Sequence, residues 1–436
     1  MGMKFFKSKK NIITFTIAAC LALAIIVTVV ALLVVKAPKA EFVSAKAGDY
    51  IVYYDKNGVD MNLTIKEYDG NCENLKITVP EKMTIDGKTY TVAKIGNKAF
   101  SGESNSKLKD LILLELPKTI IEIGDNAFES TTSLTELTIK GQVNKFGSEI
   151  LKNSGVKDLT IENLTAGYNL KSFAETTFNK IIIKNIVGNI EDFKAEYASG
   201  INAKALYLGE DVANATMLRP LIQKVETLSY YVNTELFSEN FLTTSKITTL
   251  YINGVGKSIE TEETLNIATQ AKNSVKNIYL DETCDTIGQN AFNGFVSLEN
   301  VYIYETDMTI SLDALGGANT NAKICFVSDK NINLTIKSGT TTAITSAFMS
   351  SFENIDQINS VVIANGVTSI KSGAFNSAVN LTQMSFKSNS TVTEIETGAF
   401  GSLQINFTGP TADSNHYVYN RLNSYDFASN KKSYNA

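Results

Sequence analysis

The sequence predicts a repeat solenoid, β-rich with short helical turns, behind an N-terminal transmembrane helix. One observation is a repeated six-residue motif, which reads IGNKAF at 95–100, IGDNAF at 123–128 and IGQNAF at 287–292, with looser copies at 370–375 and 395–400. A second is an apolar frame upstream of these motifs that alternates as a β-strand does. The third is an uncharged run of 24 residues near the start of the chain.

The apolar frame reads L-x-x-L-x-L and recurs thirteen times. Its central residues fall at 111, 137, 159, 181, 206, 228, 250, 278, 301, 324, 361, 384 and 405. All steps but one lie within the period of leucine-rich repeats, which is roughly 20–29 residues. The exceptional step, from 324 to 361, contains extra sequence around 331–341.

Each frame predicts a short strand with one buried face, because alternate side chains of a strand point to opposite sides. A single strand cannot bury that face alone, so successive strands must stack into a continuous core. Thirteen stacked strands would offer one ladder face about 60 Å long. In the six-residue motif we expect the Gly to permit a sharp turn and the Phe ring to fill the space between layers. Residues 146–151 and 173–178 are degraded copies of the motif.

The frame followed by I-G-x-x-A-F, often with Leu-Pro between them as at 116–117, resembles the BspA-like class of leucine-rich repeats. The resemblance covers about residues 90–410 and is weakest between about 140 and 280. The frames predict an array of about thirteen units, and the resemblance implies a β-solenoid with short helical turns on a microbial cell surface, with a role in adhesion to proteins or cells. It implies no catalytic residues.

The first 48 residues predict a membrane anchor. Residues 1–10 would be a basic cytoplasmic tail, 11–35 a transmembrane signal anchor and 36–48 a linker, which places the C-terminal body outside the cell. The apolar run is longer than that of a cleavable signal peptide. Two alternatives stay open: secretion after cleavage behind Ala40 or Ala45, and lipidation at Cys20, which follows a lipoprotein-like box.

The repeat region needs ends that face water. Residues 49–94 do not follow the repeat and read as strands with turn signals, so we expect an N-terminal β cap there. The solenoid is expected over 95–410. Gly409-Pro410 breaks the pattern, and residues 411–436 are expected to form a C-terminal cap and tail.

Charge argues against nucleic acid as a partner. Six of the 40 Lys and Arg lie in residues 1–40, which contain no acid, so the other 34 face 45 acidic residues and give residues 41–436 a formal charge of −11. A body of that sign repels a phosphate backbone.

No pattern of an enzyme, metal site or cofactor site is present in the sequence. His416 is the lone histidine and is interpreted as a surface residue. Cys72, Cys284 and Cys325 lack zinc-ligand spacing, and the last two are expected to be small buried residues. The segment beginning at Asp55 hints at a calcium loop but lacks several ligands, so a plain turn is expected.

One outward position of the frame is rich in tyrosine. The residue between the last two apolar positions points away from the core, and it is Tyr in four of the six frames centred from 206 to 324. These and one neighbour are the candidate ligand-binding residues: Tyr207, Tyr251, Tyr279, Tyr302 and Tyr304. Tyr offers a large area and a hydroxyl at interfaces, although it is also simply a good strand residue.

The sequence therefore predicts a membrane-anchored, extracellular, non-catalytic binding protein that contacts an extracellular protein or a cell-surface glycan through the strand ladder. The alternative is a structural or glycan-binding module of the cell's own envelope. An enzyme is not expected, because no acid pair or nucleophile with a base stands out.

Overall fold

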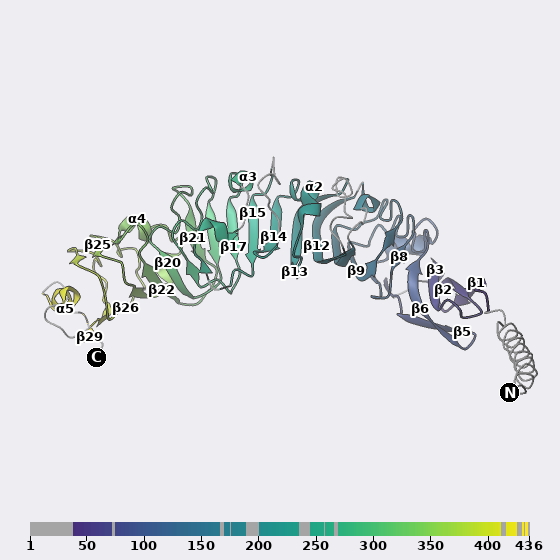
Figure 1. Ribbon diagram of the computed structural model, residues 1–436, viewed down its shortest axis with the longest axis horizontal. Helices are drawn as coiled ribbons and strands as arrows, with labels where there is room; N and C mark the ends of the chain where they lie inside the picture. The colour runs from purple at the N-terminus through teal and green to yellow at the C-terminus, as the bar shows by residue number, and fades with distance from the viewer. Residues whose placement is uncertain are drawn as a thin grey trace, which may run out of the picture.

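The apolar frames form stacked strands that wind into an elongated, curved solenoid (Figure 1). The computed structural model describes residues 38–71, 75–165, 170–174, 176–188, 200–234, 245–256, 258–265, 269–410, 416–424, 430 and 432–434. Over these residues the solenoid has about 12 turns. None of the helices described there is long and apolar enough to cross a membrane, and the anchor expected at 11–35 lies outside the described residues.

The largest sheet, named the ladder sheet, contains eleven parallel strands among the described residues. In chain order they are β4 (Lys76–Thr78), β7 (Leu113–Glu115), β9 (Glu136–Val143), β11 (Asp158–Thr165), β12 (Thr177–Val187), β13 (Asn202–Asp211), β14 (Thr227–Tyr231), β15 (Thr249–Asn253), β17 (Asn277–Leu280), β19 (Asn300–Ile303) and β21 (Lys323–Phe326). From β9 to β21 the central apolar residues of the frames pair with one another, so the predicted register is confirmed there.

A second sheet is formed by strands that alternate in the chain with the last ladder strands and by strands that follow the ladder. It contains β16 (Ser258–Ile259), β18 (Thr286–Ile287), β20 (Asp307–Ser311), β22 (Ile332–Lys337), β24 (Ile358–Ile363), β26 (Gln383–Phe386), β28 (Asn406–Gly409) and β29 (Lys432–Tyr434). A third sheet contains β23 (Ala343–Ile344), β25 (Ser369–Ile370) and β27 (Glu394–Ile395).

The expectation that one ladder runs through all thirteen frames is wrong. The long step between 324 and 361 contains an additional strand, β22, which pairs with β20 before it and β24 after it. The frames centred on 361 and 384 therefore lie in the second sheet, and the strands that begin the Ile-x-x-x-Ala-Phe segments after them, β25 and β27, form the third sheet together with β23. The ladder sheet ends at β21, beyond which a bridge joins Ile324 to Phe352.

Two frames are also misplaced in register. Leu114, and not Leu111, is the central residue of β7, because Leu108 and its neighbours form a 3₁₀ turn, η1 (Ser106–Asp110). In the last frame Phe407, and not Ile405, pairs with Met384. The outward residue of the first frame is thus Glu115, whereas Ile112 lies in the connection and is 50% exposed.

The Gly of the six-residue motif has a role different from the one expected. The left-handed residue is the fourth of the motif: Lys98, Asn126 and Asn290 have φ near +55°, and Gly373 and Gly398 replace them in the looser copies. The Gly at the second place is needed for close packing, since a Cβ on Gly288 would lie 2.3 Å from the carbonyl oxygen of Glu260 in the preceding coil. The following Phe rings pack from coil to coil, as Phe100 does on Phe128 with 6.1 Å between centroids.

Short helices complete the coils between strands. They are η2 (Leu170–Phe173), η5 (Thr216–Leu218), α2 (Arg219–Ile222), η6 (Glu262–Leu265), α3 (Thr269–Lys272), α4 (Ser346–Met349), η7 (Ile355–Gln357) and α5 (Tyr417–Leu422). In α4 the buried Met349 faces the core, while the Thr345 hydroxyl caps the first turn by accepting from the Phe348 N–H.

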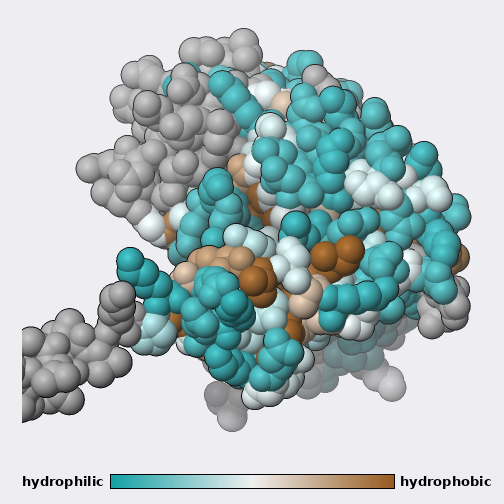
Figure 2. All heavy atoms as spheres, turned by 90° about the vertical axis from the view of Figure 1, so that its right-hand side faces the viewer, coloured by the Kyte–Doolittle hydropathy of each residue, from teal (hydrophilic) through white to brown (hydrophobic). Residues whose placement is uncertain are grey.

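The N-terminal cap sheet contains β1 (Phe42–Ala47), β2 (Tyr50–Asp55), β3 (Asn62–Tyr68), β5 (Lys82–Ile85), β6 (Lys88–Ile95), β8 (Glu122–Ile123) and β10 (Lys145–Phe146). β1 pairs antiparallel with β2, so residues 42–47 of the segment expected to be a linker form part of this sheet. Figure 2 faces this end of the molecule, whose surface is largely hydrophilic, with a group of apolar residues near the middle of the view. Phe42 and Val59 of the cap segment are exposed.

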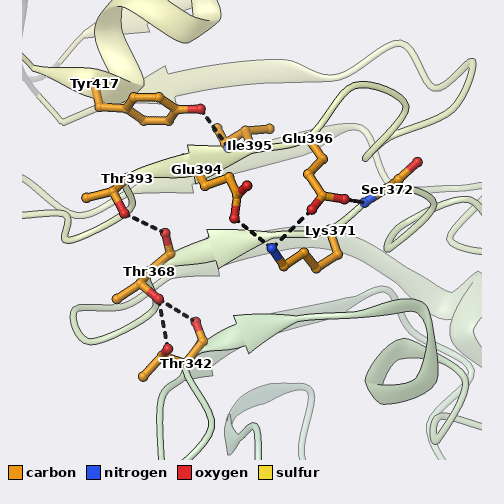
Figure 3. A network of polar contacts seen from close by, with 9 residues as sticks. All are labelled: Thr342, Thr368, Lys371, Ser372, Thr393, Glu394, Ile395, Glu396 and Tyr417. Carbon is orange, nitrogen blue, oxygen red and sulfur yellow. Dashed lines mark hydrogen bonds and ion pairs between the residues drawn. The ribbon is translucent and has the colours of Figure 1, made fainter.

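The C-terminal end is closed by α5 and β29. A polar network near this end joins two of the last coils to each other: Lys371 binds Glu394 at 2.6 Å and Glu396 at 3.0 Å, and the Glu396 carboxylate accepts from the Ser372 N–H (Figure 3). Beside it, the hydroxyls of Thr342 and Thr368 are hydrogen-bonded. Together these contacts bind three successive coils.

Candidate binding surface

The candidate tyrosines form one row across the ladder sheet. Strand register pairs Tyr207 with Ser229, Ser229 with Tyr251, Tyr251 with Tyr279 and Tyr279 with Tyr302. The apolar residues on either side of each position are buried, so the row lies on the outer face of the sheet. We name Tyr207, Tyr251, Tyr279 and Tyr302 the tyrosine row.

The rings of the row contact one another closely. The centroids of Tyr279 and Tyr302 are 4.3 Å apart with planes inclined by 11°, and those of Tyr251 and Tyr279 are 4.5 Å apart at 12°. Tyr207 reaches Tyr251 at 6.1 Å and 36°, because the residue between them is the small, buried Ser229. Adjacent strands lie about 4.8 Å apart, which is the spacing that stacks the rings.

This stacking decides which part of each ring can meet a ligand. The face of an aromatic ring carries its negative potential and the edge its positive one. Both faces of Tyr279 are covered by its neighbours, so its edge and hydroxyl remain for contact. The row therefore offers a line of ring edges and hydroxyls rather than flat platforms.

Polar side chains flank the row on both sides. On one side the pairs are Thr227 with Thr249 and Asn277 with Asn300, and the Asn300 amide donates to Asn277 Oδ1 at 3.0 Å. On the other side the Asp281 carboxylate accepts from the Gly254 and Thr283 N–H groups. The surface around the tyrosines thus has hydrogen-bonding groups that are already ordered, neutral amides and hydroxyls on one side and the Asp281 carboxylate on the other.

Tyr304 lies next to the row and is the most exposed of the candidates, at 38%. Burial raises the pKa of Tyr279 to about 12, with the neighbouring Tyr302 adding to the effect. Burial also raises the pKa values of Tyr207 and Tyr304. These three phenols are neutral at physiological pH and can both donate and accept hydrogen bonds.

The other residues considered from sequence occupy structural positions. Cys284 and Cys325 are free and buried, as expected, and burial raises the pKa of each thiol. His416 is the N-cap of α5, where its Nδ1 accepts from the Val418 N–H. Cys72 lies outside the described residues.

Asp55 is not arranged as a calcium ligand. Its carboxylate accepts hydrogen bonds from four backbone N–H groups, those of Glu41, Asn57, Val59 and Asp60. Burial favours its protonated form, but these donors outweigh that effect and lower the pKa of Asp55 to about 2. Its oxygens are used to order the turn. No group of three His, Cys, Asp or Glu suited to a metal ion occurs among the described residues.

A family model described as BspA type leucine-rich repeat region matches the chain in six copies, over residues 71–200, 222–321 and 265–406. The chain belongs to the BspA-type leucine-rich repeat family. From β9 to β21 its ladder sheet is thus formed by the frames of BspA-type repeats, and β18 of its second sheet ends at the Ile-Gly pair of the motif at 287–292. Members of this family typically serve as binding scaffolds at cell surfaces.

Solved structures of low similarity accompany the family match. A leucine-rich cell surface protein from Faecalibacterium prausnitzii is 17% identical over 90% of this chain and 95% of that one, with a TM-score of 0.28. The pneumococcal vaccine antigen PcpA is 15% identical over 91% and 100%, with a TM-score of 0.26. No curated protein sequence matches the chain. The assignment to the BspA-type family rests on the repeats alone.

Proposed function

We propose that this BspA-type chain is an extracellular, non-catalytic protein that binds another protein through the tyrosine row of its ladder sheet. The observation that carries the proposal is the close stacking of Tyr251, Tyr279 and Tyr302, flanked by neutral amide and hydroxyl groups. Tyr is enriched where proteins bind one another because it contributes area and a hydroxyl while losing little entropy.

The stacked geometry favours a protein over a glycan at this row. A sugar ring that binds to an aromatic side chain packs its C–H groups on an uncovered ring face, where the negative potential lies. The faces of Tyr279 are covered on both sides, whereas edges and hydroxyls suit the amide groups and side chains of a polypeptide. The rings are also held by their neighbours before binding, which lowers the entropy lost on association.

The test is binding of the full-length protein to a panel of extracellular matrix proteins and intact cells, measured by biolayer interferometry and adhesion. One variant changes Tyr207, Tyr251, Tyr279 and Tyr302 to Ser, and another changes the same four to Phe. The control changes Thr138 and Thr160 to Ser, on the same outward row but beyond the tyrosines.

We expect the Ser variant to lose at least tenfold in affinity, because clustered aromatic residues dominate interface energies. The Phe variant keeps the rings, so the difference between its affinity and that of the native protein measures the contribution of the four hydroxyls to binding. The Thr control should bind as the native protein does. A Ser variant that remains folded and binds with native affinity would refute the role of the row.

The same proposal places the body outside the cell, held by residues 11–35 as an uncleaved span. The support is the length of the uncharged run and the lysines before it. Membrane fractionation followed by mass spectrometry of the intact protein tests it. A full-mass protein in the membrane fraction supports the anchor. A secreted chain beginning after Ala40 or Ala45, or a lipid on Cys20, contradicts it.

A further inference from the structure

A polar cleft lies beside the second sheet, away from the tyrosine row. Its volume is about 490 Å³, and it is lined by Glu260, Thr261, Gln289, Asn290, Lys337 and Ser338. These residues come from three coils, those that contain β16, β18 and β22. The volume is within the range of small-molecule pockets, which is roughly 300–1,000 Å³.

The cleft forms because the two strands between Glu260 and Lys337 have small residues at the corresponding positions. Glu260, Gly288, Ser311 and Lys337 follow one another across the sheet at the ends of β16, β18, β20 and β22. Gly288 has no side chain and Ser311 a short one, so the side chains of Glu260 and Lys337 meet above them, with 3.2 Å between Oε2 and Nζ. This ion pair joins residues 77 positions apart in the chain.

The polar groups of the cleft are held in place by contacts among themselves. The Gln289 amide donates to the Thr340 hydroxyl at 2.5 Å, and the Thr341 N–H donates to Asp313 Oδ2 at 2.7 Å.

The chemistry of the walls selects one class of ligand. None of the six lining residues is apolar, which is wrong for a lipid or an aromatic compound. The single cation, Lys337, is already neutralised by Glu260, so the cleft carries no excess charge for a phosphate or a carboxylate. What remains are amides, hydroxyls and a neutralised ion pair, which together offer both donors and acceptors.

We propose that this cleft binds a neutral saccharide, a short run of sugar rings whose hydroxyls exchange hydrogen bonds with Gln289, Thr261 and the Glu260–Lys337 pair. A neutral polyol matches a wall that has many donors and acceptors and no net charge. The site is independent of the tyrosine row, since it lies on other strands and uses none of its residues. The chain thus carries separate surfaces for a polypeptide and for a glycan.

The experiment uses the full-length protein and a panel of neutral probes: tri-N-acetylchitotriose, maltotriose, cellotriose and xylotriose. Binding is measured by saturation-transfer NMR and by isothermal titration. The test variants are the double change Thr261→Ala with Gln289→Ala, and Ser338→Phe, which fills the cleft. The control is Gln383→Ala, an exposed amide on β26 of the same sheet.

We expect at least one neutral probe to bind and both test variants to weaken it at least tenfold, with Gln383→Ala unchanged. The Ser variant of the tyrosine row should keep saccharide binding, and the cleft variants should keep protein binding. If no probe binds the native protein, or if folded cleft variants bind as the native protein does, the proposal is overturned. Because each set of variants removes only one of the two binding surfaces, failure of the saccharide proposal would leave the protein-binding role of the tyrosine row intact.

Discussion

The hydroxyl of Tyr417, on α5, accepts a hydrogen bond from the backbone N–H of Ile395 at 2.8 Å (Figure 3). Ile395 belongs to β27, the outermost strand of the third sheet among the described residues. Its carbonyl oxygen accepts from Nε of Arg421, one turn further along the same helix. The cap helix thus satisfies both backbone groups of an edge residue with side chains, where another strand would pair with and extend the sheet.

Tyr417→Phe should lower the free energy of unfolding by about 1 kcal/mol, because the mutation leaves the Ile395 N–H without its partner. Amide hydrogen exchange at Ile395 should quicken, while exchange at Ile370, on the neighbouring strand, changes less. Tyr53→Phe, at an exposed tyrosine of the N-terminal cap, is the control. Unchanged exchange at Ile395 would mean that the bond does not protect the strand.

Phe128→Ala should cost about 3–5 kcal/mol, since it leaves a cavity in a core where rings from successive coils pack together. The ring is fully buried and lies 6.1 Å from that of Phe100. Urea unfolding followed by circular dichroism measures the loss. Val379→Ala, at a side chain that is 63% exposed, should change stability little. A cost for Phe128→Ala no larger than that of the control would contradict ring packing between coils.

Gly141→Ala should destabilise the solenoid by about 1–3 kcal/mol. An added Cβ would lie 2.1 Å from the carbonyl oxygen of Ile120 in the preceding coil, and backbone cannot move aside as a flexible side chain can. Gly200→Ala is the matched control, because its nearest neighbours are side-chain atoms at 3.5 Å or more. Thermal melts of the two variants compare them directly, and equal midpoints would argue against the close approach of the coils.

Tyr279 should ionise with a pKa of about 12, which absorbance titration of native protein against Tyr279→Phe will measure. Because the folded state holds a proton that the unfolded chain releases near pH 10, this residue stabilises the fold below that pH. Its contribution falls as the pH rises from about 10 to about 12. A difference spectrum that titrates near pH 10 would show that the ring is not desolvated by its neighbours.

Much of the fold follows from the repeats in the sequence. The frames centred from 137 to 324 pair as predicted because each has one strand with one apolar face, which leaves a single register that buries it. The first frame was misread because the sequence matches L-x-x-L-x-L twice, once from Leu108 and once from Leu111. Only the turn η1 decides between the two.

The change of sheet after β21 was not predictable from spacing. The 37-residue step between frames indicated extra sequence. The sheet that a later strand joins, however, depends on the number of strands that precede it in its coil. The position of the tyrosine row followed from the frame, whereas the cleft did not. Its residues come from coils separated by up to 77 positions and share no motif.

The extra strand β22 also limits how such an array can evolve. Duplication or loss of a whole repeat on either side of it keeps every later side chain on its own face. If a repeat moved from one side of β22 to the other, the strand formed by its frame would change sheet, together with the outward residues on that strand. Recombination can therefore lengthen or shorten the aromatic surface only within the segment before β22, and a library of repeat insertions should divide at that strand.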